Sequence, residues 1–290
     1  MPKIIVLSGL PGSGKSTFRN AIKQYMNIKE LDNVDLRKHM FQLKEVKINN
    51  KWYLYGLKDE YILILHILNI NNFGFNDSFI NDFKNYIEKY AISISRLKDY
   101  IHRIKTETNN EKLHIQELEN ILKIYKINID DFIFVINKIE NIVKILPEEI
   151  KNTIYSKLPM GRHKEIWDWH YILLKNYIIN NENIILEGIN FFPKYYQVIY
   201  NMIHALNKDY DIYIVHWWNL SLEEAKKRNR LRKDYQIIPD ETIDQMFLNI
   251  KNVQNALRNE LNFIKSDNVF DLSNLDKKEY FDIAKKIVNS

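Results

Sequence analysis

The stretch GLPGSGKSTF at residues 9–18 places three glycines, a lysine and three hydroxyl side chains within ten positions. It fits the pattern G-x-x-x-x-G-K-[ST] without deviation and follows an apolar run at residues 4–7. Glycines at this spacing let the backbone curl until successive N–H groups point inward and bind an anion at a helix N-terminus. Lys15 is expected to reach the β- and γ-phosphates of a nucleoside triphosphate, and Ser16 to ligate Mg²⁺. The residues predicted to hold the nucleotide are Gly9, Pro11, Gly12, Ser13, Gly14, Lys15, Ser16 and Thr17.

A carboxylate with basic neighbours follows the next predicted strand, in the stretch NVDLRK at residues 33–38. The carboxyl ends of parallel strands meet at one edge of a sheet, where the ligands of α/β proteins bind. Asp35 at that edge can accept the proton of an attacking hydroxyl, and Arg37 or Lys38 can hold an anionic acceptor. The same residues also suit a helix-capping aspartate with solvated basic neighbours.

Five basic residues lie within the seven positions 227–233. Arg228 and Arg232 are four apart, so on a helix they share a face. A transferring phosphoryl group carries the negative charge that would balance such a cluster. A solvated basic face is the alternative interpretation.

Short apolar strands that alternate with helices are typical of a parallel sheet built from βαβ units. The sequence predicts an α/β protein with a P-loop NTPase or kinase fold and a parallel sheet of five strands. The predicted strands are 3–8, 30–34, 183–187, 211–217 and 269–272. The predicted helices are 15–26 and 164–179 between strands and a terminal helix at 277–288 after the fifth strand.

Residues 57–158 depart from this alternation, because apolar residues recur there at steps of four and three from Phe83 to Ile104. A stripe of apolar residues with this spacing, or heptad seam, is typical of helices that pack against one another. Two further amphipathic segments follow it. We expect an inserted α-helical subdomain of about three antiparallel helices at 57–158, between the second and third strands of the sheet. Residues 1–56 and 159–290 would form the P-loop core.

Composition sets broad limits on the protein's class. The chain has 290 residues, 46% of them hydrophobic and 27% charged, and no cysteine, which excludes disulfides and thiolate chemistry. A net charge of +5 permits an anionic partner without requiring one. The longest apolar runs are too short to span a bilayer, and the N-terminus lacks the basic start of a signal peptide. We therefore expect a cytoplasmic protein with no membrane partner.

Together these stretches resemble the P-loop kinases of the polynucleotide kinase type, whose relatives include O-phosphoseryl-tRNA kinase and zeta-toxin-like small-molecule kinases. The resemblance rests on GLPGSGKSTF, on VDLR at 34–37 and on KRNRLRKDYQIIPDETIDQM at 227–246. It implies that Lys15 and Ser16 serve ATP and Mg²⁺ and that Asp35 is the general base. It also implies that Arg228 and Arg232 are lid arginines that clamp the ATP phosphates.

The chain departs from that family's pattern at two places. The family's substrate-binding arginine lies three residues after the base, whereas Arg37 lies two after Asp35 and position 38 is lysine. The family's D-x-N after the third strand is here EGIN at 187–190. Glu187 is expected to orient Mg²⁺ through water or to hold the acceptor. The predicted substrate residues are Arg37, Lys38, Glu187 and Asn190.

The expected activity is an ATP- and Mg²⁺-dependent kinase that transfers the γ-phosphoryl group to a hydroxyl. Nucleic acid is the expected acceptor, at a 5′-hydroxyl end or a hydroxymethylated base of DNA, or in RNA or tRNA. The helical insertion would then add nucleic-acid-binding surface. A small-molecule kinase for a nucleoside or sugar nucleotide is the alternative enzyme, and an ATP-gated interaction protein is the alternative outside enzymes. The oligomeric state stays open, because helical seams pack equally well within one chain and between chains.

Overall fold

The computed structural model describes residues 1–71, 73–107, 112–159, 163–188, 193–260 and 265–290. The chain divides into two compact units, which we call the core unit and the helical unit. The core unit comprises Met1–Arg37, Ile48–Trp52 and Ile166–Ser290, and the helical unit comprises Lys38–Lys47 and Tyr53–Glu165. The helical unit thus begins earlier and ends later than the insertion predicted at 57–158.

A five-stranded parallel sheet forms the centre of the core unit, in the order β2-β6-β1-β7-β8. The predicted α/β fold with five parallel strands is confirmed. Central strands of parallel sheets are covered on both faces, which explains why their sequences are continuous apolar runs. The strands are β1 (Lys3–Ser8), β2 (Lys29–Asp32), β6 (Ile184–Gly188), β7 (Asp211–His216) and β8 (Val269–Asp271).

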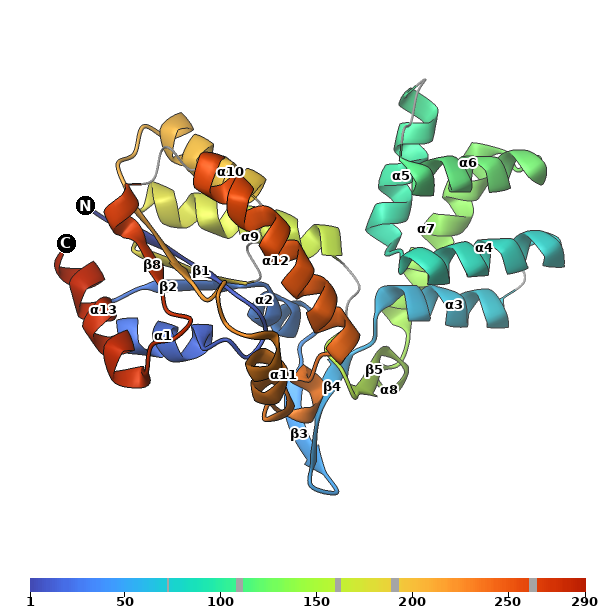
Figure 1. Cartoon of the computed structure of the whole chain (residues 1–290). Helices are drawn as coiled ribbons and strands as arrows, with labels where there is room; N and C mark the ends of the chain where they lie inside the picture. The colour runs from blue at the N-terminus through green and yellow to red at the C-terminus, as the bar shows by residue number, and fades with distance from the viewer. Residues whose placement is uncertain (72, 108–111, 160–162, 189–192, 261–264) are drawn as a thin grey trace. The chain divides into compact units, whose positions relative to one another are not determined.

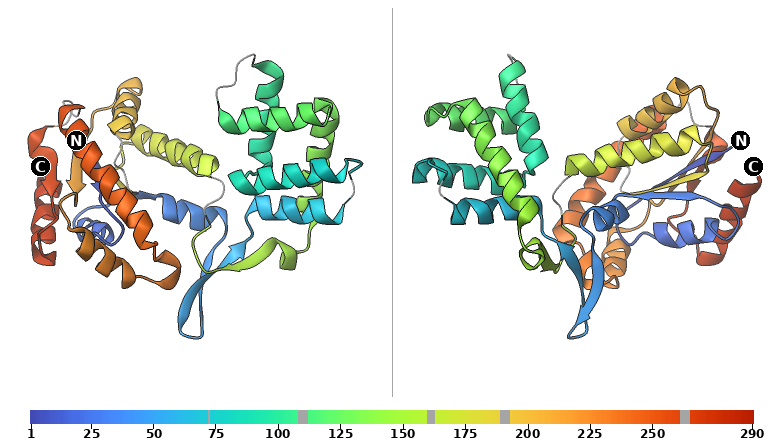
Figure 2. Two further views of the ribbon diagram at one scale, coloured as in Figure 1. Left: turned by 45° about the vertical axis from the view of Figure 1, so that its right-hand side comes forward. Right: turned by 180° about the vertical axis from the view of Figure 1, so that it is seen from behind.

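Helices cover both faces of this sheet. Figures 1 and 2 show α1 (Lys15–Ile22) and α13 (Lys277–Asn289) on one face, with α9 (His163–Ile179) and α10 (Pro193–Ala205) on the other. Helix α1 ends four residues before the predicted end at 26. The remaining elements of the core unit are the first part of α2 (Asn33–Met40), which passes into the helical unit after Arg37, α11 (Leu222–Arg230), the 3-10 turns η1 (Asp234–Gln236) and η2 (Ser266–Asn268), and α12 (Asp240–Glu260).

The chain order of the strands reverses at β1. From β1 the chain passes to β2 and β6 on one side and then to β7 and β8 on the other. Ligands of open α/β sheets bind beyond the carboxyl ends of the strands at such a reversal. The glycine-rich loop follows β1 at this position.

The helical unit contains more helices than the sequence predicted. Within the described residues it has five helices of more than ten residues, a short helix α8 and most of a three-stranded sheet in the order β3-β4-β5, whose hairpin tip Ile48–Trp52 belongs to the core unit. The expectation of about three helices was wrong in number, and the small sheet was not predicted. The elements are β3 (Lys44–Ile48), β4 (Lys51–Leu57), α3 (Glu60–Ile70), α4 (Asp77–Tyr90), α5 (Ile94–Thr106), α6 (Leu113–Ile124), α7 (Ile129–Ile145), α8 (Glu148–Lys151) and β5 (Asn152–Tyr155).

The predicted helix through residues 83–104 is divided between α4 and α5. Ala91 adopts a left-handed conformation with φ 45°, and the Ile92 N–H donates to the Ile87 carbonyl at 3.2 Å, which closes α4. Ser93 then caps α5 by accepting a hydrogen bond from the Arg96 N–H. The apolar period continues across the break because both helices bury their apolar faces in one core.

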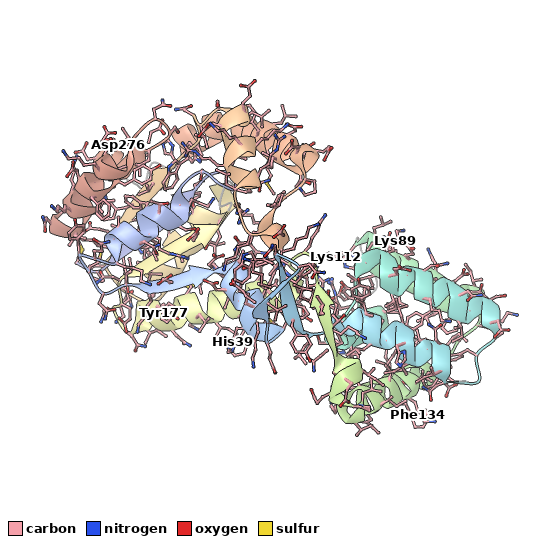
Figure 3. The ribbon with its side chains drawn as sticks, turned by 90° about the horizontal axis from the view of Figure 1, so that it is seen from below. His39, Lys89, Lys112, Phe134, Tyr177 and Asp276 are labelled. Carbon is pink, nitrogen blue, oxygen red and sulfur yellow. The ribbon has the colours of Figure 1, made fainter. Side chains whose placement is uncertain are left out.

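Each unit has its own hydrophobic core. In the helical unit Phe79, Phe83 and Phe132 are fully buried and lie in mutual ring contact. Figure 3 shows the exposed Lys89 on α4 and the exposed Phe134 on α7 at the outside of this unit. Within the described ranges, none of the helices combines the length and the apolar character that crossing a bilayer requires.

Candidate active site

The glycine-rich loop joins β1 to α1 in a conformation that requires glycine. Gly12 and Gly14 have φ values of +78° and +113°, in the left-handed region. A Cβ atom at Gly12 would lie 3.1 Å from the backbone nitrogen of Asn229, and one at Gly14 would lie 2.9 Å from the Tyr280 hydroxyl. Gly14 is the N-cap of α1, so the N–H groups of the first helical turn face the loop. This arrangement can bind an anion.

Lys15 and Ser13 also suit a phosphate ligand. The Lys15 Nζ donates to the carbonyls of Gly9 at 2.8 Å and Leu10 at 2.9 Å, so the ammonium group lies against the loop. Burial lowers the pKa of Lys15 to about 8; nearby Arg232 lowers it further, and Glu187 opposes both effects. The Ser13 Oγ is buried and has no hydrogen-bond partner among the described residues. An anion in the loop would satisfy both side chains.

Ser16 and Glu187 place two oxygen atoms that could ligate a metal ion beside the loop. The Ser16 hydroxyl donates to Glu187 Oε1 at 2.6 Å, and Arg19 Nη1 lies 2.8 Å from Glu187 Oε2. Glu187 ends the buried part of β6 and is 9% exposed. Magnesium takes oxygen ligands and typically uses one or two protein groups together with substrate phosphates and waters. These two side chains therefore fit nucleotide-borne Mg²⁺. Among the described residues, no group of three or more His, Cys, Asp or Glu side chains is arranged to hold a metal.

A second buried carboxylate, Asp32, belongs to the same cluster and was not singled out from the sequence. Asp32 is the last residue of β2 and pairs in register with Glu187 of β6. Burial raises the pKa of Asp32 to about 7; the Glu187 carboxylate raises it further, while a hydrogen bond from the Val34 N–H opposes the shift. Asp32 in turn acts on the pKa of Lys15 and of Arg232. The position of Asp32 at a strand end was the available signal, but its partner strand lies far along the chain.

Asp35, the predicted base, lies in the first turn of α2 at the margin of this cluster. Its side chain is 60% exposed, and its Oδ2 lies 4.0 Å from Arg19 Nη1. It also raises the pKa of Asp32, so the two carboxylates interact. The role of Asp35 stays a prediction.

The predicted acceptor residues occupy different environments. Arg37 is buried in the core unit, whereas Lys38 belongs to the helical unit and lies 3.3 Å from Glu45. Asn190 lies outside the described residues. Of the four predicted substrate residues, Glu187 contacts the glycine-rich loop, through the hydrogen bond that it accepts from Ser16. The acceptor-binding roles of the others stay predictions.

The two predicted lid arginines do not share a helix face, contrary to expectation, because α11 ends at Arg230. Arg228 lies on α11, where its Nε is 2.7 Å from Glu224 Oε1 and its Nη1 donates to the Ser13 carbonyl at 3.4 Å. Arg232 follows the helix. Burial lowers the pKa of Arg232, and the Glu187 and Asp32 carboxylates oppose that shift. Arg232 therefore lies within electrostatic range of the carboxylate pair.

Asn229 fixes the loop that carries Arg232. Its side chain is fully buried, donates from Nδ2 to the Ile238 carbonyl at 2.8 Å and accepts from the Ile238 N–H at 3.2 Å. Arg230 adds an ion pair with Asp240 at 2.6 Å. The segment 230–238 is thereby held as a closed loop between α11 and α12.

His170 of α9 supports the turn after β2. Its Nδ1 lies 2.8 Å from Asn33 Oδ1, and its Nε2 lies 2.6 Å from the Tyr195 hydroxyl. Because the Asn33 oxygen can only accept, Nδ1 carries the proton and Nε2 accepts from Tyr195. Burial lowers the pKa of His170 to about 4, so the ring is neutral near pH 7. This contact holds the residue next to Asp32 against α9 and α10.

No known protein-family model matches the chain. The chemical assignment of the site therefore rests on its geometry and on the fold, an α/β sheet with the glycine-rich loop where the strand order reverses.

Proposed function

We propose that the protein is an ATP- and Mg²⁺-dependent kinase that transfers the γ-phosphoryl group to a hydroxyl. One observation carries the proposal: an anion-binding loop, the cations Lys15 and Arg232 and the carboxylates Asp32 and Glu187 meet at the carboxyl end of β1. Phosphoryl transfer requires phosphate clamps and a proton acceptor together at one place. Asp32, whose pKa burial raises to about 7, is a carboxylate suited to that proton acceptor.

Each residue has a defined part in the proposed reaction. The acceptor oxygen attacks the γ-phosphorus, the bond between that phosphorus and the β,γ-bridging oxygen breaks, and ADP leaves. Lys15 and Arg232 balance the charge on the phosphoryl oxygens, and the loop N–H groups orient the chain of phosphates. Mg²⁺, held through Ser16 and oriented by Glu187, supplies further charge neutralisation when it is bound. The hydroxyl proton passes to a carboxylate of the β2–α2 turn.

Asp32 and Asp35 are the two carboxylates that can take this proton, and burial and the neighbouring charges favour Asp32. Asp32 interacts with Lys15 and Arg232, whereas Asp35 is mostly exposed beside Arg19. A general base contributes about 10²- to 10⁴-fold to a rate. We therefore expect Asp32→Asn to lower the transfer rate by about that factor while ATP binding is retained, and Asp35→Asn to have the smaller effect.

Single-turnover kinetics with ATP labelled at the γ-phosphate, together with calorimetric ATP binding, test this assignment. If Asp35→Asn abolishes transfer and Asp32→Asn does not, Asp35 is the base and the preference for Asp32 is wrong. If both variants transfer phosphate like the unsubstituted protein, the kinase proposal itself loses its proton acceptor.

For the acceptor we propose a hydroxyl of nucleic acid. The support is the resemblance of the glycine-rich loop and of residues 227–246 to kinases that act on polynucleotides or tRNA. Transfer of labelled phosphate should be measured on DNA with 5′-hydroxyl ends, DNA with hydroxymethylated bases, RNA and tRNA, against a panel of nucleosides and sugar nucleotides. Labelling of the small molecules alone makes the protein a small-molecule kinase. ATP binding without transfer to any acceptor favours the ATP-gated interaction protein.

Lys15→Ala is the matched control for these assays, because it removes the phosphate-binding ammonium and leaves the rest of the loop in place. We expect this variant to lose both ATP binding and transfer. Full ATP turnover by Lys15→Ala would contradict the assignment of the glycine-rich loop.

A further inference from the structure

The tip of the β3–β4 hairpin, residues 48–52, contacts the loop that carries Arg232. Asn49 and Asn50 have φ values of 48° and 61°, as a two-residue type I′ turn requires, and Ile48–Trp52 groups with the core unit. The Trp52 N–H donates to Asp234 Oδ2 at 2.9 Å. The Lys233 Nζ lies 4.7 Å from the centroid of the Trp52 ring, within the range of a cation–π contact.

These two contacts fall on the residues directly after Arg232. Asp234 begins η1, and the Gln236 N–H donates to the Lys233 carbonyl at 2.7 Å, so the segment is tightly turned. Asn229 fastens the other part of the same loop to Ile238. Besides the ion pair of Arg230 with Asp240, the loop is thus held by Asn229 from within and by Trp52 from the hairpin.

An arginine on a surface loop loses conformational freedom when it binds a phosphate, and that loss weakens binding. A loop that is already ordered avoids much of this cost, because the guanidinium is near its working position beforehand. The partial burial of Arg232 and its interaction with Glu187 and Asp32 are consistent with such an ordered state.

We propose that Trp52 is a positioning residue: it clamps Lys233 and Asp234 and thereby sets Arg232 for the nucleotide phosphates. The inference rests on the proposed function, since that function assigns Arg232 to the phosphates. The proposed role of Trp52 requires no contact with nucleotide or acceptor. Trp52 therefore affects the affinity for ATP only by ordering the loop that carries Arg232.

The test measures the dissociation constant of Mg·ATP by calorimetry, with kcat and KM where an acceptor is known. Trp52→Ala removes the ring contact, and Asp234→Ala removes the acceptor of the Trp52 N–H. We expect each to weaken ATP binding about fivefold, the size of one surface cation–π contact or hydrogen bond. Asp234→Asn keeps an acceptor oxygen and should bind ATP like the unsubstituted protein. Trp169→Ala, at a half-exposed tryptophan of α9, is the matched control and should leave ATP binding unchanged.

A double-mutant cycle with Arg232→Ala separates the clamp from a general structural role. If the clamp acts through Arg232, Trp52→Ala should cause no further loss of affinity in the Arg232→Ala background. An equal fivefold loss in both backgrounds, or normal ATP binding by both Trp52→Ala and Asp234→Ala, overturns the inference. Asp234→Ala keeps the test valid where Trp52→Ala fails to fold. Failure of the unsubstituted protein to bind ATP overturns the proposed function, which is a separate result.

Discussion

His170 is a buried neutral imidazole, and its titration provides a prediction at the residue scale. Its pKa is about 4 in the folded protein and about 6.5 when unfolded, so between these values the unfolded state binds the additional proton. The contribution of His170 to the free energy of unfolding is therefore fully present above about pH 6.5. This contribution decreases by about 3 kcal/mol as the pH falls toward 4. Urea unfolding of the unsubstituted protein and of His170→Gln at pH 7.5 and pH 4.5 measures the difference.

His170→Gln should lose less stability on acidification than the unsubstituted protein, because glutamine does not titrate. His204→Gln is the control, since His204 is an exposed residue of α10. Parallel loss of stability in all three proteins would show that His170 is not buried and neutral as described.

Some residues of the candidate site could be predicted from the sequence and others could not. The difference is whether their contacts join residues close together or far apart in the chain. Lys15 and Ser16 belong to one local pattern between a strand and a helix, so spacing alone predicted their arrangement. Asp32 enters the site through its pairing with Glu187, more than 150 positions away in the chain. No local pattern contains that pairing. The sequence singled out Asp35, three positions after Asp32, and its role as the base stays a prediction.

At the scale of elements, Asn229 determines whether the Arg232 loop stays closed. Asn229→Ala would leave the N–H and carbonyl of Ile238 without these side-chain partners, at a cost of about 1–3 kcal/mol. We expect a lower melting temperature together with a higher KM for ATP. Asn201→Ala, at an exposed position of α10, should change stability by no more than about 0.5 kcal/mol. A normal KM for ATP in Asn229→Ala would contradict a role for loop closure in nucleotide binding.

Helix boundaries in the helical unit show why periodicity did not predict the number of helices. Phe83 and Ile87 of α4 and Leu97 and Ile101 of α5 face the same core, so their spacing resembles one long seam. The break depends on Ala91, whose left-handed conformation follows from the packing of the two helices. Alanine carries no sequence signal for such a turn, because glycine is the usual residue there.

At the scale of the whole molecule, separate cores predict separate unfolding transitions. Phe132→Ala removes a fully buried ring from the helical unit and should destabilise that unit by about 3–5 kcal/mol. Mg·ATP should raise only the transition of the core unit, where the glycine-rich loop lies. Differential scanning calorimetry with and without Mg·ATP measures both effects. A single transition that moves as one in every case would contradict independent cores.

Ile185→Ala in β6 is the counterpart of Phe132→Ala, because Ile185 is fully buried in the other core. It should lower the transition of the core unit and leave the helical unit unchanged.

The insertion point has a consequence for synthesis of the chain. Strand β1 is made first, but its two neighbours, β6 and β7, both come from beyond the helical unit. At about 5–20 residues per second, a ribosome needs on the order of ten seconds or more to reach them. During that time the apolar run at residues 4–7 of β1 has no neighbouring strand, while the local contacts of α3 to α7 allow those helices to form. The nascent chain therefore exposes an apolar strand that is buried in the folded protein, and shielding of β1 by a chaperone would protect the yield of folded protein.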